Sequence, residues 1–337
     1  MDCYNQNFIK CGGVILNSSS SSSGDHVQTK MSSRRVYILL ALLVVFIWGF
    51  NFIVADKAVS QIPPFLLVAM RYFVVALIFL PFTKRNGLPW KYLILVGFFG
   101  GVVQFSGLFW GLSLGVSSGV AATLIQSQAI FTILLATLFI NEKFSWFQWA
   151  GLLAGAAGLV LIAASGDASA PIVGVLWVLL GGLGWACSNI VLKKAGKISP
   201  WTLTVWQSTT VIPIMLVLSL IFESGDYAQL SNITLQGVGS VIYIALLATG
   251  LGNFIWYYLV QQFGPSNTAP FSLLVPVVAI VSGWLVLGES LTSIQAAGIV
   301  IILVGLTLIQ LSSRFKRIKL INVSKSERLQ AKEEHFN

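Results

Sequence analysis

Neutral hydrogen-bonding side chains interrupt the long apolar stretches of this sequence. Amides and hydroxyls can bind a zwitterion or another polar solute, because they donate and accept hydrogen bonds without adding net charge. They can equally join one helix to another in a membrane, at about 0.6–2 kcal/mol each. The candidate binding residues are Trp48, Asn51, Arg71, Gln104, Gln126, Gln128, Trp185, Asn189, Asn253 and Ser272.

Two of these amides, Gln126 and Gln128, fit a binding role as well as a structural one. Residues two apart project from different faces of a helix. Two amides near the centre of one apolar segment are costly unless they are buried in protein or face a cavity. For Asn51, Asn189 and Ser272, each taken alone, bonding between helices is the simpler interpretation.

Arg71 is a cation expected about 10 Å inside an apolar segment, where its charge costs several kcal/mol unless it is paired, hydrated or extended to the headgroups. No carboxylate stands near it at helical spacing. Two interpretations stay open: the side chain snorkels to the outer headgroups, or it faces a cavity and meets a substrate carboxylate. Glu142 and Glu289 are expected at opposite membrane faces, where they cap and orient adjoining helices, through the short turns before spans five and ten, rather than carry protons.

Groups that could do covalent or metal chemistry are scarce. The two histidines, His26 and His335, lie in the polar tails, and no HExxH motif or nucleotide-binding loop is present. Cys3, Cys11 and Cys187 have neither metal nor disulfide spacing. The sequence therefore predicts no catalytic residue, no metal and no cofactor, and it disfavours an enzyme.

The elements that must position these residues are membrane-spanning helices. The 337 residues are 56% apolar and 9% charged, with a mean hydropathy of +0.85. Apolar stretches of about 20 residues recur along the chain, and no strand-like alternation favours a barrel. The predicted spans are about 36–55, 64–82, 92–112, 119–140, 146–164, 171–192, 202–222, 237–259, 268–288 and 293–312. The predicted fold is an all-α integral membrane protein with ten transmembrane helices.

The distribution of Lys and Arg predicts the orientation. Of the loop positions that ten spans define, basic residues crowd the side shared by both termini, and the other side holds only Lys57. The positive-inside rule then places both termini in the cytoplasm, in a multi-pass protein of the cytoplasmic (inner) membrane. The net charge of +9 therefore indicates topology and not a nucleic-acid partner. Residues 1–33 form a polar leader predicted to be disordered, and residues 313–337 a cytoplasmic tail.

An internal repeat organises the predicted spans. One constant shift in residue number, called the early-span shift, brings Trp48 onto Trp185 and Pro63 onto Pro200. A slightly larger one, called the late-span shift, pairs Ala122 with Ala269, Glu142 with Glu289, Gln148 with Gln295, Gly151 with Gly298 and Gly158 with Gly305. Because five helices are an odd number, a second copy enters the membrane upside down. The chain is therefore expected to be two inverted five-helix repeats, 34–165 and 171–312, around a central cavity.

Several motifs together carry a family resemblance over residues 36–312. They are Trp-Gly-Phe-Asn-Phe at 48–52, Arg-Tyr-Phe at 71–73, Gln-Ser-Gln-Ala-Ile-Phe-Thr at 126–132, Trp-Ala-Cys-Ser-Asn-Ile at 185–190 and Ser-Leu-Leu-Val-Pro-Val-Val at 272–278. The sequence resembles the EamA family of the drug/metabolite transporter superfamily, and within it the O-acetylserine/cysteine exporters. It departs from those exporters at Ser127 and Asn253, which leaves the substrate open.

The resemblance implies a transporter that exports small polar metabolites by alternating access, most simply amino acids or derivatives such as cysteine or O-acetylserine. Its partners would be that solute and the lipid bilayer, and a homodimer is compatible with the sequence. The competing class is a channel or another membrane-embedded protein that transports nothing. Sugar phosphates would need several cations in the spans, and Arg71 is the one present. No carboxylate or imidazole lies deep in a span, so facilitated efflux is expected rather than proton exchange.

Overall fold

The computed structural model describes residues 23–116, 118–142, 144–164, 171–196, 198–287 and 292–309. Residues 1–22 of the predicted leader, Glu289 and the predicted tail lie outside these residues. Helix α1, Ser23–Val59, begins inside the segment predicted as a disordered leader. The chain divides into two units, Met1–Leu39 and Leu40–Asn337, and the contacts below all belong to the second.

Within the described residues, nine helical stretches are long and apolar enough to cross a membrane. A further apolar helix, Ser293–Ile309, is shorter and is called the last helix here. No strand occurs in the described parts of the chain, so the all-helical membrane fold predicted from the sequence is confirmed at that level. Numbered as spans one to nine in chain order, the stretches are Arg35–Val59, Pro64–Phe82, Trp90–Ser113, Val120–Ile140, Trp146–Ala164, Ile172–Lys194, Pro200–Phe222, Leu235–Phe263 and Pro265–Val286.

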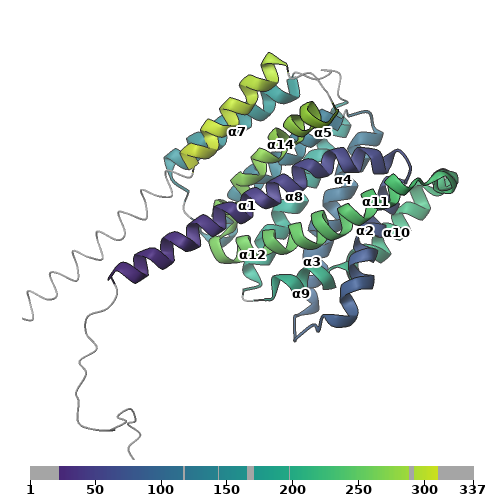
Figure 1. Ribbon diagram of the computed structural model, residues 1–337, viewed down its shortest axis with the longest axis horizontal. Helices are drawn as coiled ribbons and strands as arrows, with labels where there is room; N and C mark the ends of the chain where they lie inside the picture. Colours follow the sequence, from purple (N-terminus) through teal and green to yellow (C-terminus); the bar gives the residue numbers. More distant parts are fainter. Residues whose placement is uncertain are drawn as a thin grey trace, which may run out of the picture. The chain divides into compact units, whose positions relative to one another are not determined.

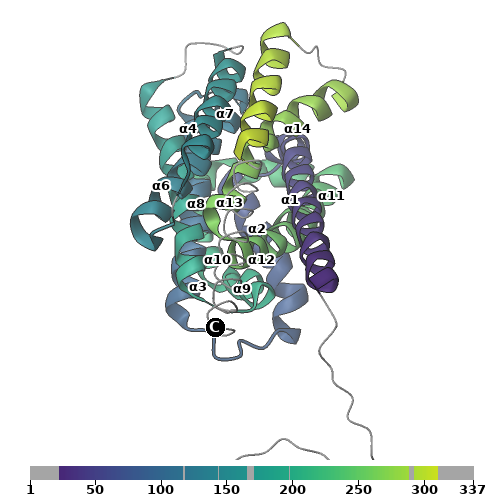
Figure 2. The ribbon, with the colours of Figure 1, turned by 90° about the vertical axis from the view of Figure 1, so that its left-hand side faces the viewer.

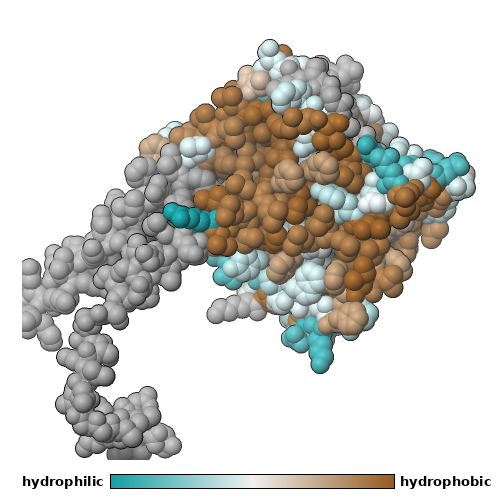
Figure 3. Space-filling model, viewed as in Figure 1, coloured by the Kyte–Doolittle hydropathy of each residue, from teal (hydrophilic) through white to brown (hydrophobic). Residues whose placement is uncertain are grey.

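Large apolar side chains cover much of the outer surface of these helices. Leu77, Leu153, Val160 and Leu220 are each more than 60% exposed. Figure 3 shows hydrophobic residues spread over the visible face, with hydrophilic residues gathered toward its margins. An apolar surface of this extent indicates contact with lipid. Helices can make that contact because their backbone groups are already hydrogen-bonded within the helix.

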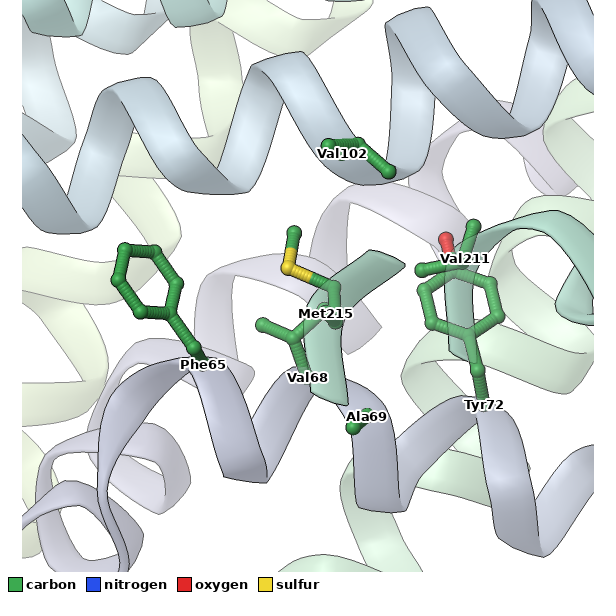
Figure 4. Packing of buried hydrophobic residues seen from close by; sticks show 7 residues of the cluster. All are labelled: Phe65, Val68, Ala69, Tyr72, Val102, Val211 and Met215. Carbon is green, nitrogen blue, oxygen red and sulfur yellow. The ribbon is translucent and has the colours of Figure 1, made fainter. Parts of the chain in front are cut away.

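A buried apolar cluster joins spans two, three and seven. Figure 4 shows Phe65, Val68, Ala69 and Tyr72 from one helix facing Val102, Val211 and Met215 from two others. All seven side chains are nearly or fully buried, and they hold the first half of the chain against the second. The elements are α2 (Pro64–Phe79), η2 (Phe98–Val103) and α10 (Ser208–Phe222); η1 (Leu80–Phe82), α9 (Pro200–Trp206) and η4 (Ser224–Asn232) complete these spans and the loop that follows span seven.

Helix α8, Ile172–Lys194, forms span six and packs against spans three and four. The contact with span three is close because glycines face one another. A Cβ atom on Gly107 would lie 2.5 Å from the carbonyl oxygen of Trp177 and 2.8 Å from the Cα of Gly181. The glycines of span three therefore let two helices touch through their backbones.

Spans three and eight are each interrupted by a π-helical segment. Such segments replace the hydrogen bonds of the α-helix by bonds to the fifth residue along the chain, and they frequently occur at functional sites. In both spans the α-helix resumes at an amide residue, Gln104 in span three and Asn253 in span eight. The elements are α3 (Trp90–Gly97), η2 and α4 (Gln104–Ser113) in span three, then α11 (Leu235–Tyr243), η5 (Ile244–Gly252) and α12 (Asn253–Phe263) in span eight.

Spans four and nine are broken by 3₁₀ turns at positions related by the late-span shift. The break in span nine contains Pro270 and ends just before Pro276. Both prolines lack the backbone donor that a regular helix needs. In span four the turn contains Gln126. The elements are α5 (Ser118–Leu124), η3 (Ile125–Ser127) and α6 (Gln128–Ile140), then α13 (Pro265–Thr268), η6 (Ala269–Leu274), α14 (Val275–Ser282) and η7 (Gly283–Leu287).

Span five, α7 (Trp146–Ala164), and the last helix begin with the same capping arrangement. The Gln148 side chain accepts from the backbone N–H of Ser145, and the Ser145 hydroxyl accepts from Gln148 N–H. Thr292 and Gln295, their counterparts under the late-span shift, make the same two bonds. Each reciprocal pair satisfies two backbone donors that would otherwise be free at a helix start.

Helix α7 and the last helix lie side by side in Figures 1 and 2, where the last helix is yellow. Their contact runs through glycines: a Cβ on Gly151 would lie 2.5 Å from the Gly305 carbonyl oxygen, and one on Gly158 would lie 2.7 Å from that of Gly298. Gly298 and Gly305 are the counterparts of Gly151 and Gly158 under the late-span shift. Each glycine therefore packs against the counterpart of the other, which is the pattern that a two-fold axis produces.

Candidate binding cavity

A cavity of about 190 Å³ lies among spans one to four, with spans six, eight and nine closing it. Most of its wall is apolar, from residues such as Phe52, Leu67, Val68 and Phe105. The polar part of the wall contains eight of the ten predicted site residues: Trp48, Asn51, Arg71, Gln104, Gln126, Gln128, Trp185 and Asn253. An apolar cavity with a few convergent polar groups is the usual form of a small-molecule site.

Asn189 and Ser272 do not line this cavity. The Asn189 amide donates to Thr132 Oγ1 at 3.2 Å and accepts from Trp256 Nε1 at 2.9 Å. Both ends of the amide are therefore used in joining spans six, four and eight, as the helix-bonding interpretation expects. Ser272 is buried in η6, and its hydroxyl has no hydrogen-bond partner among the described residues.

Arg71 is buried in α2 and faces the cavity; it does not reach for the membrane surface. Its Nε donates to Thr249 Oγ1 at 2.6 Å. Its guanidinium carbon lies 4.4 Å from the ring centroid of Phe105, within the range of a cation–π contact. In the part of the chain that the structure describes, no carboxylate forms an ion pair with Arg71. The cation is therefore held in place by neutral groups and is free to meet an anion in the cavity.

The amides around the cavity are only partly satisfied. Gln128 Nε2 donates to Gln126 Oε1 at 2.9 Å, so this pair forms a unit within the break of span four. Buried donors or acceptors without a partner cost about 1–3 kcal/mol each, unless water or a ligand supplies one. Five such atoms belong to cavity residues: Asn51 Oδ1, Gln104 Oε1, Gln128 Oε1, Trp185 Nε1 and Asn253 Nδ2.

Tryptophans form one part of the cavity wall. Trp48 and Trp185 both line it, and their rings meet edge to face with centroids 5.5 Å apart. Trp256 lies behind them, 5.1 Å from Trp48. The indole of Trp48 donates to the Ala248 carbonyl oxygen at 3.0 Å, in the π-helical segment of span eight. These rings give the cavity a rigid aromatic end.

Thr249 is a site residue that sequence reasoning missed. It is fully buried in η5, where its hydroxyl donates to the Ile244 carbonyl oxygen at 2.8 Å and accepts from Arg71. A threonine in an apolar stretch carries no signal of its own. The unpaired charge of Arg71 was the available clue, since a buried guanidinium must find acceptors in a neighbouring helix.

Two carboxylates near span ends serve as helix caps. Glu142 accepts from the backbone N–H of Ser266 at 3.2 Å, so it caps α13 at the start of span nine. Glu142 was expected to cap and orient an adjoining helix through the turn before span five; the helix start that it caps is that of span nine, and Ser145 caps span five. Glu223 accepts from the N–H groups of Phe65 at 2.6 Å and Leu66 at 3.0 Å, at the start of α2. A negative charge at a helix N-terminus is favourable.

Comparison with known proteins finds one family model that matches two separate stretches of the chain. The model of the EamA-like transporter family matches residues 35–164 and again residues 172–311. The chain belongs to the EamA-like transporter family. It is accordingly a multi-pass membrane protein of a transporter family and not of an enzyme family, with the lipid bilayer and a small-molecule substrate as the partners that membership entails.

Two relatives from this family carry informative names. A "Probable amino-acid metabolite efflux pump" of Salmonella typhimurium is 36% identical over 286 residues, covering 82% of this chain and 96% of the relative. A protein of the same name from Escherichia coli is 34% identical, covering 80% of this chain and 92% of the relative. A solved crystal structure of a protein with 17% identity has the same fold, with a TM-score of 0.70 over 83% of this chain and 98% of the other.

Proposed function

We propose that this EamA-family chain exports a small zwitterionic metabolite, an amino acid or a derivative such as O-acetylserine, by alternating access. The cavity is its outward-facing binding site, and Trp48, Asn51, Arg71, Gln104, Gln126, Gln128, Trp185 and Asn253 bind the solute. Asn189 and Ser272 contribute either to packing between helices or to the binding site in another conformational state. The relatives named as efflux pumps support the direction of transport.

The observation that carries this proposal is the unpaired cation of Arg71 among unsatisfied amides. A buried guanidinium is stabilised when a carboxylate enters and pairs with it, and bidentate pairing also orients the solute. The amides of Asn51 and Gln128 can then meet the solute's ammonium group and polar side chain. A cavity of about 190 Å³ is small, which favours a small solute such as an amino acid.

Alternating access requires two arrangements of similar energy, which an inverted repeat supplies. We infer ten transmembrane helices in two repeats, 34–165 and 171–312, with the last helix as the tenth span. Three features recur between the halves and support this arrangement: the capping pairs of Ser145 and Thr292, the reciprocal glycine contacts of span five and the last helix, and the interrupted spans.

The orientation follows from the basic loops, which put both termini in the cytoplasm of an inner-membrane protein. The cavity wall continues to Val59, Leu67, Leu112 and Ala121. Those residues stand near the end of span one, the start of span two, the end of span three and the start of span four. All four ends lie at one membrane face, which this orientation makes the outer face.

The test is transport by purified protein in proteoliposomes. Vesicles loaded with a panel of radiolabelled amino acids, O-acetylserine and uncharged solutes of similar size should release the zwitterions faster than protein-free vesicles. Arg85→Gln is a matched control, because Arg85 contacts the Trp90 ring at 4.7 Å and does not line the cavity, so this variant should transport normally. Release of no zwitterion by the folded protein would contradict the proposal.

A further inference from the structure

Six serine hydroxyls among the described residues are buried without a hydrogen-bond partner. Three of them, in Ser188 of α8, Ser208 of α10 and Ser272 of η6, belong to residues that are at most 1% exposed. None of these three lines the cavity. An unpartnered buried hydroxyl costs about 1–3 kcal/mol. Three hydroxyls in such closed positions therefore need an explanation that packing alone does not give.

The repeat relates these serines to the cavity. The early-span shift, which brings Trp48 onto Trp185, also brings Asn51 onto Ser188 and Arg71 onto Ser208. The late-span shift brings Ile125 onto Ser272. Asn51, Arg71 and Ile125 all line the cavity. Each of these three serines is thus the counterpart of a residue that lines the cavity in this state.

The same relation extends to the remaining cavity residues of spans one, two and four. Apart from Gly196, which is exposed and corresponds to Val59, every counterpart of these residues is buried. Two of these counterparts, Trp185 and Val275, line the cavity themselves, and the other buried ones are closed in this state. The polar members of this closed set are Ser188, Asn189, Thr204, Ser208, Thr268 and Ser272.

We propose that Ser188, Ser208 and Ser272 line the inner half of the translocation path and bind the solute when the protein faces the cytoplasm. The proposal rests on the transport function proposed above. In the inward-facing state the three hydroxyls gain partners from water and solute, which offsets the cost that they carry here. This inner path is neutral, because a serine stands where its counterpart is the cation Arg71.

Cysteine accessibility tests this assignment without any knowledge of the solute. Cys3, Cys11 and Cys187 are first replaced by serine, and Ser188→Cys, Ser208→Cys and Ser272→Cys are made one at a time. An impermeant methanethiosulfonate reagent is then applied to inside-out vesicles. Lys194→Cys, at the exposed end of α8, reports the rate of an open site. Ala136→Cys, fully buried in α6 and not the counterpart of a cavity residue, reports a closed one.

Each serine position should react from the inner face at about 0.1–10% of the Lys194→Cys rate, the usual population of a minor conformer. Ala136→Cys should stay at background. In Asn51→Cys/Ser208→Cys, prior attachment of a bulky reagent from the outer face should hold the cavity open and abolish the inner reaction. Inner reactivity no greater than that of Ala136→Cys, or reactivity that the bulky group leaves unchanged, would overturn the proposal.

The labelling result and the transport result are independent. A chain that releases zwitterions from proteoliposomes, with all three serine positions unreactive, keeps the proposed function and loses this inner path. A chain that labels as expected but carries none of the zwitterions keeps the path and loses the proposed solute class.

Discussion

Trp48 and Trp185 meet edge to face with ring centroids 5.5 Å apart, although one comes from span one and the other from span six. They are counterparts under the early-span shift, and they meet as two equivalent residues do beside a two-fold axis. Their hydrogen bonding is nevertheless unequal. Trp48 Nε1 donates to the Ala248 carbonyl oxygen, whereas Trp185 Nε1 has no partner among the described residues. Of the two indole N–H groups in the cavity wall, only that of Trp185 is therefore available to a solute.

This difference predicts opposite effects of removing each indole N–H. Trp48→Phe loses a hydrogen bond within the protein and should lower the free energy of unfolding by about 0.5–1.5 kcal/mol. Trp185→Phe loses no such bond, so its stability should match the parent while transport falls, because the solute loses a donor. Thermal unfolding in detergent, read beside proteoliposome efflux, separates the two. Equal loss of transport at unchanged stability in both variants would argue against the assignment.

The Gln126–Gln128 pair predicts a loss of transport without a loss of folding. In the parent, the Gln128 amide nitrogen donates to Gln126 and its oxygen has no partner among the described residues. Gln128→Leu removes this amide from the cavity. Efflux should drop, and folded yield should not. Gln236→Leu, at an exposed position near the start of α11, is the matched control and should leave efflux unchanged. If efflux by Gln128→Leu equals that of the parent at matched protein level, the amide is structural.

Much of the fold could be predicted because lipid imposes length and apolarity on every span. Spans two and five, Pro64–Phe82 and Trp146–Ala164, begin and end where the apolar pattern does. The interruptions in spans three and eight could not be predicted, since a π-helical turn still satisfies its backbone and needs no special residue. The start of α1 at Ser23 was not predicted either, because the polar composition of residues 1–33 is typical of disorder.

The candidate site could be predicted in composition but not in partners. Polar residues inside spans are few, so those at the cavity were identifiable as candidates. Their pairing depends on which helices meet, which a single sequence does not encode locally. Glu142 illustrates this, because it caps the start of span nine, far along the chain, and not the helix beside it. Arg71 was recognised as unusual, while its acceptor Thr249 came from span eight.

The asymmetry of basic loops predicts the sidedness of labelling. Single cysteines beside Lys84 and beside Lys197, in a variant without native cysteines, should be protected from an impermeant thiol reagent in intact cells. A cysteine beside Asp167 should react, because that loop faces outward in the proposed topology. Labelling of either basic loop in unbroken cells would be incompatible with the inverted ten-span arrangement.

The placement of carboxylates predicts transport that needs no proton gradient. Glu142 and Glu223 are both occupied as helix caps at span ends, and no described carboxylate side chain lines the cavity. Flux down a solute gradient should therefore persist when the pH is equal on both sides of the vesicle membrane. Uphill accumulation driven by an imposed proton gradient, and abolished by an ionophore, would show instead that a proton relay exists.

The central claim is that Arg71 binds the carboxylate of the solute. The most direct measurement compares proteoliposome efflux of an amino acid and of its methyl ester, in the parent and in Arg71→Gln. The parent should prefer the free acid, and Arg71→Gln should lower acid efflux by about 10- to 100-fold, since a hydrogen bond to a charged group contributes about 1.5–3 kcal/mol. Ester efflux should change little. Equal loss for acid and ester, or no preference in the parent, would contradict the account.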